Sequence, residues 1–162
     1  MNFPISILPS YIVVSKFYSH LVLLGIITLI CFIAGFTPSI YLIQLLIFIP
    51  YALLLSISIA IFTSTLNVII RDTQMIIQAL MRMLFFVSSI LYLPDNKIVI
   101  NIIKYNPIYF LAEGYRSATL YKEWFFINNW DLVIYNFVFL IITFVIGAYV
   151  NFKYRDYFSD FM

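Results

Sequence analysis

The residues best placed for chemistry form a polar stripe in a segment that is otherwise apolar. Gln74, Gln78 and Arg82 follow one another at intervals of four, and Ser89 falls near the same line of a helix. Arg82 lies about ten residues into this segment, which is about 15 Å along a helix. If the segment crosses a bilayer, a guanidinium at that depth costs roughly 2.5–3.5 kcal/mol and is expected to face a protein interior or a wet cavity. The stripe therefore predicts a polar path or a subunit contact, with extension of Arg82 to the lipid headgroups as the alternative.

Two further charged pairs are candidates for a functional role. Arg71 and Asp72 precede the stripe, and a carboxylate at a helix start interacts favourably with the helix dipole. We interpret them as a junction that contacts a cytoplasmic partner, with a simple turn as the alternative. Glu113 and Arg116 are three residues apart, a spacing that allows an ion pair on a helix. The Tyr and Trp residues around this pair predict an interfacial belt or, alternatively, a rim that touches a sugar or a lipid headgroup.

Residue types that catalysis or metal binding would need are scarce. His20 is the single histidine and Cys31 the single cysteine. The sequence contains no phosphate-binding loop, no dinucleotide-binding glycine motif and no zinc-binding motif. We therefore expect no enzymatic activity, no metal and no cofactor, and an ATP-driven process would need a partner chain to bind the nucleotide. The net charge of +2, without a basic run, gives no reason to expect a nucleic-acid partner.

Long apolar segments position these polar residues. Hydrophobic residues make up 64% and charged residues 10% of the 162 positions, far from the balance of soluble domains. Between Lys16 and Arg71 there is no Asp, Glu, Lys or Arg, and only His20 could carry a charge. About 20 apolar residues in a helix cross a bilayer core. The sequence therefore predicts an all-α integral membrane protein, with residues 1–162 forming a single membrane domain.

The apolar segments have room for about four membrane-spanning helices. The predicted spans are residues 11–36, 40–66, 73–93 and 132–150. Residues 97–130 are mixed and aromatic and contain Pro107 and Gly114, so we expect short re-entrant or interfacial helices there. Four spans place both termini on one side, but the positive charges do not identify that side. The two sides carry equal numbers of positive residues. The terminal side has Lys16, Arg71, Lys153 and Arg155, and the other side has Lys97, Lys104, Arg116 and Lys122.

Three stretches of the sequence resemble the permease subunit of ABC-2 type exporters, in particular the teichoic acid translocation permeases of Gram-positive bacteria. They are residues 2–20, 67–92 and 102–121, with the sequences NFPISILPSYIVVSKFYSH, NVIIRDTQMIIQALMRMLFFVSSILY and IIKYNPIYFLAEGYRSATLY. Two features are fairly specific for this family when they occur together. One is the Arg-Asp junction followed by the polar stripe, and the other is Asn-Pro followed by Glu-Gly-Tyr-Arg. Their order and spacing match as well, so the resemblance covers nearly the whole chain.

The resemblance implies a role for each stretch. Residues 2–10 would dock on an ATPase subunit, and the residues expected to make that contact are Phe3, Pro4, Ile5, Ile7 and Leu8. Arg71 and Asp72 would form a second cytoplasmic junction. Residues 98–121 would form short re-entrant helices near the outer face, with Glu113 and Arg116 in the second of them. This resemblance places both termini in the cytoplasm of a multi-pass protein of the plasma membrane.

The resemblance also implies partners and a substrate. The family combines two permeases with two ABC ATPase subunits and moves a lipid-linked polymer between the permeases. We therefore expect a second copy of this chain, an ATPase, membrane lipid and a lipid-linked teichoic acid or related polymer as partners. The residues expected to line the path of the polymer are Gln74, Gln78, Arg82 and Ser89. The alternatives are an O-antigen or capsular polysaccharide permease, or a membrane protein that does not transport, such as an assembly factor or a truncated fragment.

The sequence departs from the family pattern in two places. Family permeases carry an amphipathic helix and two further spans before the Phe-Pro stretch, whereas this sequence starts at that stretch. The chain thus corresponds to the last four of six spans, and we expect either a truncated gene or a start assigned at an internal Met. Family members often have a proline near Ser89, where this sequence has Ser88 and Ser89.

Overall fold

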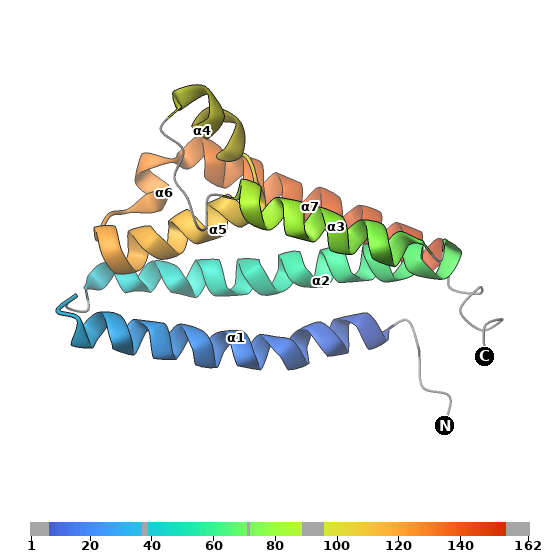
Figure 1. Ribbon diagram of the computed structural model, residues 1–162, viewed down its shortest axis with the longest axis horizontal. Helices are drawn as coiled ribbons and strands as arrows, with labels where there is room; N and C mark the ends of the chain where they lie inside the picture. Colours follow the sequence, from blue (N-terminus) through green and yellow to red (C-terminus); the bar gives the residue numbers. More distant parts are fainter. Residues whose placement is uncertain (1–6, 37–38, 71, 89–95, 155–162) are drawn as a thin grey trace.

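The computed structural model describes residues 7–36, 39–70, 72–88 and 96–154, and every element in these ranges is helical (Figure 1). In chain order the elements are α1 (Leu8–Ile33), η2 (Ile40–Gln44), α2 (Leu45–Ile69), α3 (Thr73–Val87), α4 (Lys97–Ile103), α5 (Pro107–Arg116), η3 (Ser117–Tyr121), α6 (Phe125–Asn128) and α7 (Trp130–Lys153). Among the described residues, three helices are long and apolar enough to cross a membrane: α1, the continuous stretch of η2 and α2, and α7. The predicted all-helical class is confirmed, and these helices indicate membrane insertion.

The predicted third span, residues 73–93, is described only in its first part. It begins as α3, which ends at Val87 after 15 residues. Fifteen helical residues rise about 22 Å, less than the roughly 30 Å of a bilayer core. Residues 89–93 lie outside the described ranges, so the structure supports three spans and the fourth stays a prediction. The short helices predicted within residues 97–130 are present as α4, α5, η3 and α6, and their re-entry into the bilayer is likewise a prediction.

Helix α1 begins and ends three residues earlier than the predicted range 11–36. Pro9 suits the first turn of a helix, because the backbone N–H there needs no partner within the helix. The helix stops where Gly35 adopts a left-handed φ of 93°. The Gly35 N–H donates to Phe32 O at 3.1 Å, and the N–H of the next residue donates to Cys31 O at 3.0 Å. These two bonds close the helix C-terminus in the arrangement that favours glycine at this position.

The buried core lies where α5 and α6 pack onto α2. Four aromatic rings, those of Phe48, Tyr51, Phe110 and Phe125, are nearly inaccessible to solvent. Their edge-to-face contacts have ring centroids 5.2–5.7 Å apart, and each such pair adds about 0.5–1.5 kcal/mol beyond the buried area. A Cβ at Gly114 would lie 2.3 Å from the Phe48 ring. Helix α5 can therefore approach α2 this closely only because residue 114 is glycine.

Helices α2 and α7 form the most extensive helix pair and run side by side in Figure 1. A Cβ at Gly147 would lie 3.1 Å from Ser58 O, so the two backbones approach closely at this point. Near the end of the pair, Asn151 Nδ2 donates to Thr65 Oγ1 at 3.2 Å. Small residues at the contact and polar bonds across it are the features that hold membrane helices together.

Helices α1 and α3 lie outside this core. No residue of α1 is buried, and Thr73 is the only buried residue of α3. Helix α1 packs mainly along α2. Figure 1 shows the starts of α1 and α3 and the ends of α2 and α7 together at one end of the molecule. The end of α1 and the start of α2 lie at the opposite end, near α6.

Candidate functional site

A groove runs along α1 where this helix faces α2, α3 and α5; we call it the α1 groove. Its first part lies between the start of α1, the end of α2 and the start of α3, and has a volume of about 410 Å³. Its second part, also about 410 Å³, lies between α1, α2 and α5. Ile12 and Val13 line both parts, so the two adjoin. Polar groups line the groove at Thr63, Ser64, Asn67, Gln74 and Gln78 in the first part, and at Lys16, His20 and Ser56 in the second.

The predicted polar stripe on α3 is divided by this groove. Gln74 and Gln78 line its first part and are exposed. Arg82 is exposed too, but it does not line the groove. The Arg82 Nε donates to Gln78 O at 3.3 Å, one turn earlier on the same helix. The structure thus brings the two glutamines beside α1 and leaves Arg82 on the open surface of α3.

The residues predicted to contact a cytoplasmic partner gather at one end of the molecule where they are described. Ile7 and Leu8 are exposed at the start of α1. Asp72 is exposed and directly precedes α3, although its side chain makes no capping hydrogen bond with that helix. Both helix starts lie at the same end in Figure 1. Five predicted site residues lie outside the described ranges: Phe3, Pro4, Ile5, Arg71 and Ser89.

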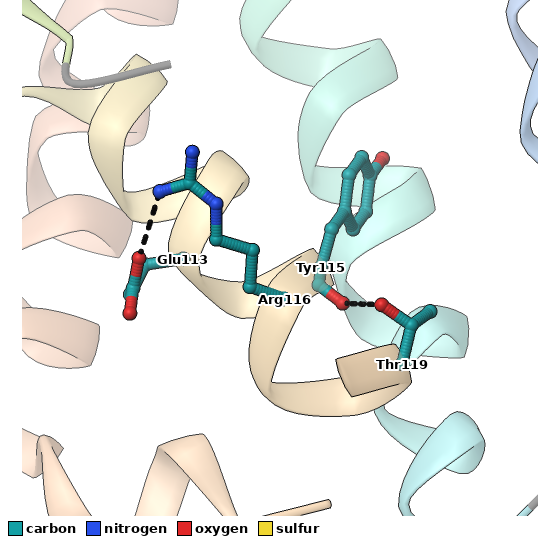
Figure 2. A network of polar contacts seen from close by, with 4 residues as sticks. All are labelled: Glu113, Tyr115, Arg116 and Thr119. Carbon is teal, nitrogen blue, oxygen red and sulfur yellow. Dashed lines mark hydrogen bonds and ion pairs between the residues drawn. The ribbon is translucent and has the colours of Figure 1, made fainter. Parts of the chain in front are cut away.

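The ion pair expected from the spacing of Glu113 and Arg116 is present on α5. Arg116 Nη1 lies 3.2 Å from Glu113 Oε2, and the two side chains are 22% and 20% exposed. Figure 2 shows this pair on one side of the helix and the Tyr115 ring on the other, toward α2. Burial, and secondarily the Glu113 carboxylate, raises the pKa of Tyr109 above its ordinary value. The pair neutralises two charges on a helix that packs directly against the core.

Gln44 is a structural anchor that sequence reasoning missed. It is 1% exposed, at the point where η2 leads into α2. Its Nε2 donates to Glu123 O at 2.7 Å, and its Oε1 accepts from the Phe125 N–H at 2.9 Å. The carboxamide therefore fixes the segment between η3 and α6 onto the start of α2. The signal in the sequence was a lone carboxamide within the apolar range 40–66.

A second missed contact joins α1 to α5. A hydrogen bond of 3.1 Å connects His20 Nε2 with the Tyr115 hydroxyl, and the two rings stack with centroids 6.0 Å apart. The Phe17 and His20 rings also lie close together, with centroids 5.3 Å apart. Burial raises the pKa of Tyr115 to about 12, so its hydroxyl stays protonated at neutral pH. His20 also lines the second part of the α1 groove, and its hydrogen bond is a polar link between α1 and the core.

The described part of the chain offers groups for binding. Its groove presents carboxamides, hydroxyls and one ammonium along apolar walls, whereas no group of three His, Cys, Asp or Glu residues that could hold a metal occurs among the described residues. No protein-family model matches the sequence, and no curated protein matches it either.

Proposed function

We propose that the chain is the membrane subunit of an ATP-driven exporter that moves lipid-linked teichoic acid, or a related cell-surface glycopolymer, across the plasma membrane. The observation that carries this proposal is the exposed polar stripe on α3. Gln74, Gln78 and Arg82 are exposed on a helix that buries only its first residue. The resemblance of residues 67–92 and 102–121 to export permeases supports the same conclusion.

An exposed polar stripe needs a polar neighbour in the bilayer. Near the headgroup layer Arg82 and the carboxamides of Gln74 and Gln78 still need polar partners, because a charged or amide group that faces hydrocarbon loses its hydrogen bonds to water. A second copy of the chain opposite α3 would remove this cost and leave a polar path between the copies. A glycopolymer offers many hydroxyl groups to such a path.

The energy for transport would come from a separate ATPase subunit. The chain carries no nucleotide-binding motif, and the exposed starts of α1 and α3 lie together at one end. We place the ATPase contact at this end. Because α1 and α3 make few buried contacts, they are the helices that nucleotide-driven closure of the ATPase would displace relative to the α2–α7 pair.

The experiment that tests this proposal measures polymer export in cells that express the protein with its partner ATPase. Arg82→Ala should lower the amount of lipid-linked polymer reaching the cell surface at least tenfold at unchanged protein level. The matched control is Met83→Ala, which alters an exposed neighbour on the same helix outside the stripe. Unchanged export in Arg82→Ala, or an equal loss in both variants, would contradict a path along the stripe.

A further inference from the structure

We propose that the α1 groove binds an anionic phospholipid of the bilayer, with the lipid phosphate at Lys16 and an acyl chain along the apolar walls. This inference requires that the chain is inserted in a membrane, and it does not rest on the transport function. Four features of the groove support it: its size, its charge, its depth and its unused carboxamides.

The size of the groove suits a chain-like ligand. Each part, at about 410 Å³, lies within the roughly 300–1,000 Å³ typical of small-molecule sites. An acyl chain is one carbon wide and can follow the second part past Phe17 and His20, on the core side of Lys16.

The charge of the groove is positive and unopposed. Lys16 lines the second part, and neither part is lined by an Asp or a Glu. No acidic side chain of the described ranges lies within ion-pair distance of the Lys16 ammonium. A cation at the membrane surface attracts anionic lipids. A phosphate at Lys16 would supply the partner that the described part of the chain does not.

The position of Lys16 along α1 matches the headgroup layer. The 26 residues of α1 rise about 39 Å, roughly 9 Å more than the bilayer core. Lys16 lies about 12 Å from the start of the helix, and lysine side chains extend from such positions to the interface. With the end of α1 at the far boundary of the core, the Lys16 ammonium reaches the phosphate layer on the near side.

The carboxamides near this layer are also unused. Asn67, Gln74 and Gln78 line the first part of the groove and are exposed. In the described part of the chain their side chains have no hydrogen-bond partner, in contrast to Gln44, whose two ends are both bonded. Amide N–H groups at this depth can donate to the phosphate and ester oxygens of a lipid. They complete a polar entrance to an apolar groove.

The test is native mass spectrometry of the protein released from nanodiscs that contain equal amounts of phosphatidylglycerol and phosphatidylcholine. The unaltered protein should retain phosphatidylglycerol in preference to phosphatidylcholine. Lys16→Gln should lower the retained phosphatidylglycerol about fivefold, the effect expected for one cation at a membrane surface. The control Lys153→Gln removes an exposed lysine at the same end of the molecule and should leave retention unchanged.

A second variant tests the walls of the groove separately from its charge. Ser56→Phe places a ring in the second part, where the acyl chain would lie, and should reduce the retention of both lipids. Circular dichroism and gel filtration must show that each variant keeps the helix content and elution volume of the unaltered protein. Equal retention of the two lipids by the unaltered protein, or no change in Lys16→Gln, would overturn the proposal. A dimer that forms without lipid and is lost in Ser56→Phe would also overturn it, because a second copy would then occupy the groove.

Discussion

The core formed by α2, α5, α6 and α7 and the surface formed by α1 and α3 are built from similarly apolar sequence but use it differently. In the core, Gly114 admits the Phe48 ring and Gly147 admits the α2 backbone. On the surface, a Cβ at Gly25 of α1 would meet no atom within 4 Å. In a bilayer apolar side chains need no burial, so close approach and polar bonds decide which helices pack tightly.

The polar groups of the two regions differ in the same way. Gln44 and Asn136 are buried in the core with partners for their side chains. Gln74, Gln78 and Arg82 on the surface are exposed, and their side chains make no hydrogen bond or ion pair with another helix in the described part of the chain. The comparison indicates that the core determines the shape of the molecule, and that the surface is available to bind lipid, polymer or a second copy.

The largest expected effect comes from filling the closest contact of the core. Gly114→Ala would place a Cβ 2.3 Å from the Phe48 ring, and overpacking of this kind lowers the free energy of unfolding by about 1–3 kcal/mol. Gly25→Ala should be neutral or stabilising, because alanine favours a helix over glycine by up to about 1 kcal/mol. Thermal unfolding in detergent, followed by gel filtration, measures both. Equal losses in the two variants would show that α1 is packed as tightly as α5.

The next effect concerns the carboxamide anchor of the core. Gln44→Met would leave Glu123 O and the Phe125 N–H without their buried partner, which should cost about 1–3 kcal/mol of stability. Hydrogen exchange should also become faster in residues 122–128. Gln78→Met is the matched surface change and should stay within about 0.5 kcal/mol of the unaltered protein. If Gln44→Met kept the stability of the unaltered protein and its slow hydrogen exchange in residues 122–128, the anchoring role of Gln44 would be contradicted.

The smallest effect concerns the link between the two regions. A double-mutant cycle of His20→Ala and Tyr115→Phe should give a coupling energy of about 0.6 kcal/mol, the average for polar contacts between membrane helices. The same cycle with Lys16→Ala in place of His20→Ala should give no coupling, since Lys16 makes no hydrogen bond to Tyr115. A coupling near zero in the first cycle would show that α1 is held by apolar contact with α2 alone.

The elements of the fold that the sequence predicts are those with local signals. The apolar runs indicated the three long helices, and Pro107 marked the start of α5 within the region 97–130 where short helices were expected. Asn106 illustrates such a signal, because it precedes Pro107 and accepts a hydrogen bond from the Ile108 N–H at 3.0 Å to begin α5. The spacing of Glu113 and Arg116 predicted their ion pair for the same reason.

Contacts between distant parts of the chain left no such signal. Gln44 binds the backbone of residue 123, 79 positions later, and His20 meets Tyr115, 95 positions later. A single polar residue in an apolar run looks the same whether it anchors a loop or faces lipid. The stripe on α3 could be predicted because its period repeats within one helix. The α1 groove could not, because it is lined by Gln74 and Gln78 but not by Arg82, and this depends on where α1 lies.

The measurement that tests the central claim most directly is water accessibility along α3 in a lipid bilayer. With Cys31 replaced by serine, single cysteines at stripe positions 74, 78 and 82 are compared with single cysteines at positions 76, 80 and 83 on the opposite face of the helix. A functional polar surface on α3 predicts that a membrane-impermeant maleimide labels the stripe positions and leaves the opposite positions unlabelled. Equal labelling of both sets would contradict it, because α3 would then present no distinct polar face to a path or a partner.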